Sequence, residues 1–290
     1  MCTDPVLASG VEKRLAERLV DLGIGLIGEV CVLRYWELSL VARCETSVGT
    51  LCHKEVPAIF ANEGRVSAWL AQRVPHVVPR VVGFGDGWLL SEFVTALPHH
   101  GSDSSRFAAI AEIQRLIDPA EALDIGVPLR TPRWMLEDLR RQALAGACES
   151  WLPETLTRWS SRFEDACSRY EQLDIPVSLV HGDLNETNVV YGVDGLAVID
   201  WTDAHLGLPF EDLCIPGHDG PPQGAEALLK PWRERLTGAR VEEAVRLLDV
   251  LGPLSNLWMH AQLLEACPGQ PRLLETTMNW LRNLEETSNA

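Results

Sequence analysis

The sequence predicts an α+β protein in two lobes: a small antiparallel sheet with one helix, then a larger, mainly helical part with a short β insert. Residues suited to strands gather before residue 94, whereas apolar residues further along recur at the spacing of helices. One strand-like stretch, 177–199, interrupts those helices. We therefore expect an N-terminal lobe over 1–94 and a C-terminal lobe over 95–290, which suits a chain of 290 residues.

A helix is expected near the start of the chain. Thr3-Asp4-Pro5 gives the start signal, because Asp4 can cap the first turn and proline fits the first helical position. Gly23 ends the pattern. The apolar residues in between repeat at helical spacing: Val11, Leu15, Leu19 and Leu22.

The next elements are strands around one helix. Residues 29–56 are rich in strand formers and contain a hairpin turn at Ser47-Val48-Gly49, so we expect an antiparallel meander there. A helix capped by Asn62 follows. Two more strands are expected between Pro79 and Val94, around a turn at Gly83–Gly87.

The rest of the chain is expected to be mainly helical. The β insert comprises Val177–Val180 and a hairpin of Val189–Tyr191 with Leu196–Ile199, joined by a turn at Gly192–Gly195. The helices follow from apolar periodicity. They are expected near 107–117, 131–146, 156–173, 222–236, 240–251, 254–266 and 271–286.

The composition excludes several classes of partner. Asp and Glu number 41 against 25 Lys and Arg, a net charge of −16 that repels nucleic acid and anionic membranes. The same field would attract cationic small molecules, although solubility alone also explains it. The eight cysteines show no metal-binding spacing, no apolar stretch is long enough to span a membrane, and residues 1–14 do not resemble a signal peptide. We expect a cytoplasmic protein.

One segment carries a recognisable chemical pattern. His181-Gly182-Asp183-Leu184-Asn185-Glu186-Thr187-Asn188 follows an apolar strand, and Asp200 stands at the end of the next hairpin. Phosphoryl transfer needs a carboxylate that accepts the proton of the attacking hydroxyl, together with oxygen ligands that hold Mg²⁺ against nucleotide phosphates. Asp183 is the candidate base, and Asn188 and Asp200 are the candidate metal ligands.

The alternative is a loop whose Asp and Asn only satisfy backbone groups. The full spacing, the flanking strands and the returning Asp200 favour the catalytic interpretation. His181 is expected to brace this loop rather than to transfer protons.

These residues resemble the aminoglycoside phosphotransferase and choline kinase family, whose members share the protein-kinase-like bilobal fold. The resemblance covers most of the chain and is strong at His181–Asn188 and at Ile199-Asp200-Trp201. It implies nucleotide binding in the first lobe, and catalysis with acceptor binding in the second. Gly207–Leu213 also resembles the family's following segment, whose aspartate, here Asp212, supports the catalytic loop.

The resemblance also implies residues for the nucleotide. Lys54 occupies the position of the phosphate-binding lysine, and Glu63 on the next helix is its best partner. An ordinary surface lysine is the alternative for Lys54. Ser91 and Phe93 resemble the hinge between lobes, where the Ser91 carbonyl and the Phe93 amide would hold the purine. Because backbone groups make those contacts, the side chains do not distinguish adenine from guanine, and the phosphate donor is ATP or GTP.

A glycine segment offers two positions for the loop that covers the phosphates. Gly23–Val30 fits G-x-G-x-x-G-x-V, but a helix rather than a strand precedes it. We therefore interpret these glycines as a helix end and a strand entry. The covering loop would then be Arg34–Ser39, with the amides near Leu38 and Ser39 and the Ser39 hydroxyl over the phosphates. Gly23–Val30 is the alternative.

The resemblance implies that the acceptor lies between the catalytic loop and the helices of the second lobe. Asp203 and Glu186 are its candidate contacts. Other residues lie within reach but have plain structural explanations, Trp258 as core and His260 as a satisfied histidine. They are His205, Glu211, His218, Asp219, Trp258 and His260.

The sequence therefore predicts a small-molecule kinase that transfers the γ-phosphoryl group of ATP or GTP, with Mg²⁺, to a hydroxyl. An antibiotic acceptor, with resistance as the outcome, is favoured by the resemblance. A metabolic kinase for an amino alcohol or sugar is the alternative, and a nucleotide-binding pseudokinase is the alternative from another class. The acceptor is a small molecule, possibly cationic, and the chain is a monomer or a homodimer.

Overall fold

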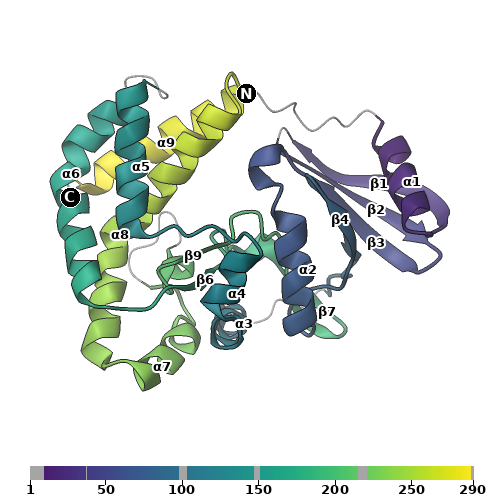
Figure 1. Cartoon of the computed structure of the whole chain (residues 1–290), viewed down its shortest axis with the longest axis horizontal. Helices are drawn as coiled ribbons and strands as arrows, with labels where there is room; N and C mark the ends of the chain where they lie inside the picture. The colour runs from purple at the N-terminus through teal and green to yellow at the C-terminus, as the bar shows by residue number, and fades with distance from the viewer. Residues whose placement is uncertain (1–9, 37, 98–102, 147–150, 215–220, 289–290) are drawn as a thin grey trace.

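The computed structural model describes residues 10–36, 38–97, 103–146, 151–214 and 221–288. It has the α+β architecture that the sequence predicts, with a five-stranded antiparallel sheet first and a helical part after it (Figure 1). The strands run in the order β1-β2-β3-β5-β4. Their bounds are β1 Leu26–Trp36, β2 Ser39–Thr46, β3 Gly49–Glu55, β4 Val81–Gly85 and β5 Trp88–Glu92.

The register of this sheet places Lys54 in its middle. β2 and β3 form the expected hairpin across Ser47 and Val48, and Val41 lies opposite Lys54. On the other side of β3, Lys54 lies opposite Leu89 of β5. Facing side chains in paired strands lie on the same face of a sheet, so Val41, Lys54 and Leu89 share one face.

Two helices flank the sheet. α1 (Val11–Asp21) buries Leu15 and Leu19 against Cys44, Leu51 and Leu90 of the strands. Gly23, at φ 69°, follows the end of α1, and β1 begins at Leu26, so the glycine segment ends a helix and enters a strand as expected. The predicted start of this helix at Thr3-Asp4-Pro5 lies outside the described residues.

The second helix, α2 (Glu63–Arg73), joins the sheet to the rest of the molecule. Its Trp69 and Leu70 belong to the same apolar core as Phe107 and Ile110 of α3. Asn62 precedes this helix but does not cap it, which corrects the sequence expectation. Its backbone is already helical, and its side chain donates instead to the Gly126 carbonyl at 3.4 Å.

The helical part is a bundle in which α5, α6 and α8 pack on one another (Figure 1). α5 starts where proline and a capping side chain coincide: Pro132 occupies the first turn and Thr131 Oγ1 accepts from the Trp134 amide at 3.3 Å. The helices are α3 Asp103–Leu116, α4 Pro119–Asp124, α5 Pro132–Ala145, α6 Trp151–Gln172, α7 Glu226–Arg235, α8 Gly238–Ala266 and α9 Pro271–Ser288.

Two further sheets have two strands each. β6 (Ser178–Val180) pairs with β9 (His205–Gly207), and β7 (Val189–Gly192) pairs with β8 (Gly195–Val198). The segment 181–188 connects them. The Ile199 amide donates to the Asn188 carbonyl at 3.0 Å and so closes this segment.

Some elements differ from the sequence expectation. The helices expected at 240–251 and 254–266 are one helix, α8, which passes through Pro253. Gly83–Gly85 lie in β4, so the turn is confined to Asp86 and Gly87. α4 and β9 were not expected. Among the described residues, no helix has the length and apolarity needed to cross a bilayer.

Candidate active site

The loop after β6 is anchored by one buried carboxylate, that of Asp212. Asp212 Oδ2 accepts from the His181 amide and Oδ1 accepts from the Gly182 amide, both at 2.9 Å. Burial raises the pKa of Asp212, and these contacts with His181 and Gly182 oppose the rise. Because both carboxylate oxygens bind consecutive amides, the backbone is fixed where the chain turns towards Asp183.

Gly182 is required at this turn on two grounds. Its φ is 85°, a conformation that side chains disfavour. A Cβ atom there would also lie 2.6 Å from the Asp203 carbonyl oxygen. Gly182, the residue before Asp183, therefore packs directly against the Asp203 backbone.

His181 braces the loop, as its buried position indicates. Its Nδ1 accepts from the Asp183 amide at 3.3 Å, so its Nε2 carries the proton that it donates to the Ile199 carbonyl at 2.9 Å. The ring also contacts Trp201, with centroids 4.6 Å apart. With both nitrogens engaged and the ring fully buried, His181 links the loop to the segment that carries Asp200.

Asp183 is exposed and oriented by two amide side chains. Asn185 Nδ2 donates to Asp183 Oδ1 at 2.9 Å, and Asn188 Nδ2 donates to Asp183 Oδ2 at 2.9 Å. Asn188 Nδ2 also donates to the Asp183 carbonyl at 2.8 Å. Since the Asn188 nitrogen is directed at Asp183, its Oδ1 is the atom left to ligate a cation.

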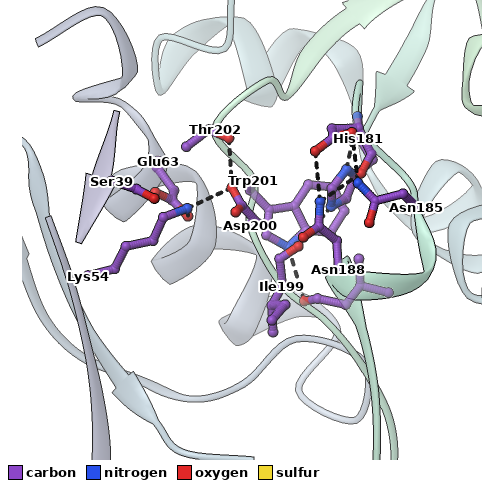
Figure 2. A network of polar contacts seen from close by, with 12 residues as sticks. Ser39, Lys54, Glu63, His181, Asn185, Asn188, Ile199, Asp200, Trp201 and Thr202 are labelled. Carbon is purple, nitrogen blue, oxygen red and sulfur yellow. Dashed lines mark hydrogen bonds and ion pairs between the residues drawn. The ribbon is translucent and has the colours of Figure 1, made fainter. Parts of the chain in front are cut away.

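Asp200 connects this loop to the sheet. Its Oδ1 accepts from Lys54 Nζ at 2.6 Å and from Thr202 Oγ1 at 2.7 Å. Lys54 Nζ also donates to Glu63 Oε1 at 2.8 Å. Figure 2 shows Lys54 and Glu63 on one side of Asp200, with Asn188 on the other. The structure thus brings together the lysine, the glutamate and the aspartate that the sequence singled out.

Burial and charge act in opposite directions on these groups. Burial would lower the pKa of Lys54, but Glu63 and Asp200 raise it above its usual value, so the ammonium stays charged. Burial would raise the pKa of Asp200, and Lys54 lowers it overall. Glu63 is the most enclosed group, and its burial raises its pKa to about 7 against the pull of Lys54.

The donor set suits Mg²⁺. Asn188 Oδ1 and the free Asp200 Oδ2 are both hard oxygen atoms, which Mg²⁺ prefers, and phosphate oxygens and water usually complete its shell. Among the described residues, no group of three or more His, Cys, Asp or Glu side chains could hold a metal ion.

The hinge differs from expectation. The Phe93 amide donates to the Thr50 carbonyl at 3.1 Å as the sheet continues past β5, so it is not available to a purine in this structure, and that expectation is wrong. Ser91 lies opposite Cys52 within the ladder. The next amide along, that of Val94, has no hydrogen-bond partner among the residues that the structure describes.

The covering-loop candidates lie at the start of β2. Ser39 is buried, and its Oγ accepts from Trp36 Nε1 at 2.6 Å, which leaves its own hydroxyl proton for another acceptor. The expected loop is shorter than predicted: Arg34–Trp36 belong to β1 and Ser39 begins β2, so Leu38 is the one described residue between the strands, and Glu37 lies outside the described residues.

The acceptor-side candidates fall into separate environments. Asp203 Oδ1 is buried without a hydrogen-bond partner among the described residues, and burial raises the pKa of Asp203 to about 6. Glu186 is exposed.

The other residues near the acceptor side have structural partners or lie outside the described residues. His205 Nε2 lies 3.2 Å from Glu211 Oε2. His260 is a satisfied histidine, 2.9 Å from Thr277 Oγ1. His218 and Asp219 lie outside the described residues.

Sequence reasoning missed two residues at this site. Thr202 bonds Asp200, and its place two residues after an aspartate at a strand end was the available signal. Arg130 Nη1 donates to the Asp203 carbonyl at 3.3 Å, and its guanidinium lies 4.6 Å from the ring centroid of Trp258. No local pattern marks Arg130, because its neighbours come from distant segments.

The model of the phosphotransferase enzyme family matches residues 41–248. None of the curated proteins matches the chain.

Three solved structures illustrate the fold that this chain shares. The GDP and kanamycin complex of APH(2")-IIIa is 15% identical, with a TM-score of 0.67, and 96% of this chain and 98% of that one are covered. A putative fructosamine-3-kinase from Thermobifida fusca is 20% identical, with a TM-score of 0.61 and coverage of 94% and 98%. Macrolide 2'-phosphotransferase MphH from Brachybacterium faecium is 19% identical, with a TM-score of 0.58 and coverage of 91% and 95%.

Proposed function

The chain belongs to the phosphotransferase enzyme family, and on that premise we propose that it transfers the γ-phosphoryl group of ATP or GTP, with Mg²⁺, to a hydroxyl of a small molecule. The observation that supports this most strongly is the contact of Lys54 Nζ with both Glu63 and Asp200, at 2.8 and 2.6 Å. It joins a lysine of the sheet to an aspartate 146 residues later, beside the Asp183–Asn188 pair.

The roles follow from what each side chain can still do. Asp183 has a carboxylate fixed by Asn185 and Asn188, so it can orient an acceptor hydroxyl and take its proton. Asn188 Oδ1 and Asp200 Oδ2 would hold Mg²⁺, which neutralises charge on the transferred phosphoryl group. Lys54 supplies a fixed positive charge for the phosphates, and buried Glu63 keeps that ammonium in place. Catalysis then rests on positioning and electrostatics.

We also propose which lobe binds which substrate. Nucleotide binding belongs to residues 1–94, and the acceptor site with the catalytic loop belongs to 95–290. For the purine, the unoccupied Val94 amide is a better candidate than the Phe93 amide, because the latter is engaged by Thr50.

An antibiotic is the acceptor class that we put first. Structures of similar fold include an aminoglycoside-bound protein and a macrolide 2'-phosphotransferase. A metabolic hydroxyl is the second candidate, supported by the similar fold of a putative fructosamine-3-kinase. A pseudokinase is disfavoured, because Lys54, Asp183, Asn188 and Asp200 are all present in a connected arrangement.

The test compares Asp183 with an aspartate outside the site. Purified protein is incubated with Mg²⁺, ATP or GTP and a panel of hydroxyl-bearing antibiotics and sugars, and products are detected by the mass of one added phosphate. Asp183→Ala should lower kcat by about 100-fold or more while nucleotide affinity is retained. Asp124→Asn, at the exposed end of α4, should leave both unchanged. Full turnover by Asp183→Ala would refute the proposed base.

A further inference from the structure

An arginine lies on the acceptor side of the catalytic loop. Arg130 stands just before α5, and its amide donates to the Leu206 carbonyl of β9 at 2.8 Å. Its Nη1 donates to the Asp203 carbonyl at 3.3 Å, and its guanidinium lies over Trp258 of α8. Three separate elements therefore fix this cation, which is half-buried and still reachable from solvent.

Most N–H donors of this guanidinium have no hydrogen-bond acceptor among the described residues. It makes no ion pair with any residue that the structure describes, and its one hydrogen bond goes to a neutral carbonyl. Burial lowers the pKa of Arg130, but an arginine remains protonated because its usual pKa is above 12. The charges of Asp203 and Glu211 oppose this lowering only in part, and neither carboxylate forms an ion pair with Arg130 among the described residues. A carboxylate supplied by a ligand would therefore stabilise this partly desolvated cation further.

The position of Arg130 relative to the reaction centre follows from shared contacts. The Asp203 carbonyl that accepts from Arg130 is the same atom that approaches Gly182, where a Cβ would lie 2.6 Å from it. Gly182 immediately precedes Asp183. Arg130 lowers and Asp183 raises the pKa of Asp203, so the guanidinium and the proposed base both lie near this one residue.

Most carboxylates near Arg130 and Trp258 already have hydrogen-bond partners. Glu211 contacts Ser255 and His205. Asp138 Oδ2 accepts from Trp258 Nε1 at 2.8 Å and from Gln262 at 3.2 Å. A cationic acceptor would find two carboxylates there without a hydrogen bond or ion pair among the described residues, the exposed Glu186 and the buried Asp203, which has Arg130 beside it. The net charge of −16 does not decide this, since exposed charges beyond about 10 Å are screened at physiological salt.

We propose that Arg130, held over Trp258, binds a carboxylate of the acceptor and so selects hydroxy acids over amino alcohols and amino sugars. The planar guanidinium has donors arranged as a fork that matches the two oxygens of a carboxylate. This inference rests on the proposed function, and it reverses the expectation of a cationic acceptor that the acidic composition favoured.

The test uses three sugars of one ring size that differ in charge: glucuronate, glucose and glucosamine. Their affinities are measured by calorimetry on protein loaded with Mg²⁺ and a non-hydrolysable ATP analogue. Wild type should bind glucuronate at least about tenfold more tightly than glucose, and glucosamine no better than glucose. Arg130→Gln should abolish that preference, and Arg130→Lys should restore part of it.

A matched control exists on α6, where Arg162 lies 5.1 Å from the ring centroid of Trp159. Arg162→Gln should keep the preference for glucuronate, and an unchanged nucleotide affinity should show that Arg130→Gln is folded. Equal binding of the three sugars by wild type, including no binding of any, would overturn the inference, as would a preference that survives in Arg130→Gln. Glucuronate binding through Arg130 without any phosphate transfer to the acceptor panel would instead refute the proposed function alone.

Discussion

At the scale of single residues, the catalytic loop depends on one position without a side chain. Gly182 has a φ of 85° and faces the Asp203 carbonyl at a distance that excludes a Cβ atom. Asp212 binds its amide from below. The absence of a side chain lets the two segments carrying Asp183 and Asp200 approach each other.

Replacing Gly182 by alanine should therefore damage both stability and turnover. The left-handed backbone alone costs about 1–2 kcal/mol with a side chain present, and the contact with Asp203 adds to that. We expect a loss of more than about 2 kcal/mol in the free energy of unfolding, measured with urea, and at least about a tenfold fall in kcat. Gly23→Ala is the control, since Gly23 has φ 69° but open space around it, so only the conformational cost should appear. Equal effects of the two substitutions would contradict this account.

Residue patterns predicted the polar contacts better than the backbone ones. The joining of Lys54 to Glu63 was expected from spacing and resemblance, because a buried cation needs a carboxylate on the neighbouring helix. The engagement of the Phe93 amide by Thr50 could not be predicted, since it depends on how far the β3–β5 ladder continues. The role of Arg130 could not be predicted from local sequence, because it depends on contacts with Asp203 and Trp258, which are distant in sequence.

At the scale of elements, α1 is attached to the sheet by a partly buried ionic cluster. Glu55 at the end of β3 accepts from Arg14 Nε at 2.9 Å, contacts Arg18 and lies 3.2 Å from His53. Burial would raise the pKa of Glu55, but the hydrogen bonds from His53, Arg14 and Arg18 hold it well below its ordinary value of 4.5. The cluster fixes α1 over the face of the sheet opposite to Lys54.

Glu55→Gln should loosen this attachment in a pH-dependent way. Because the folded pKa of Glu55 is lowered, its contribution to stability is complete above about pH 4.5 and is lost as pH falls below that value. We expect a loss of about 2 kcal/mol at neutral pH, between the roughly 3–5 kcal/mol of a broken buried pair and the about 1 kcal/mol of an exposed one, since Arg14 is partly exposed. Urea unfolding from about pH 7 to about pH 3 should show the difference from wild type shrinking as pH falls. Glu45→Gln, in an exposed pair with Arg43, should cost less than about 0.5 kcal/mol. A constant difference at every pH would contradict the linkage.

The bounds of α8 show that burial of apolar residues can outweigh the local preference of proline to end a helix. Pro253 predicts a break in α8, since proline removes a helical hydrogen bond at a cost of about 3 kcal/mol. The helix continues because Leu251, Leu254 and Leu257 are buried on both sides of the proline, and two shorter helices would lose that burial. The strands and the hairpin at Ser47–Gly49 were predictable, because their pattern is repeated over many residues.

At the scale of the whole molecule, the sheet and the helical part meet through few polar contacts at the proposed nucleotide site. Lys54 comes from β3, whereas Asp200 follows β8, and the ion pair between them is the direct link at this site. A nucleotide with Mg²⁺ would contact both residues at once. Ligand binding there should therefore stabilise the molecule as a unit, by an amount that depends on metal.

Thermal unfolding with and without Mg²⁺ tests this coupling. At a nucleotide concentration about 100 times Kd, we expect about 2.7 kcal/mol of added stability and a higher Tm, with most of it lost on chelation of Mg²⁺. Asp200→Asn should remove the metal-dependent part. Asp200 has a φ of 64°, which asparagine adopts readily, so this variant changes the charge without a new backbone cost. Asp124→Asn should retain the full metal-dependent shift. Equal stabilisation of wild type by nucleotide with and without Mg²⁺ would rule out Asp200 and Asn188 as ligands of a nucleotide-bound metal.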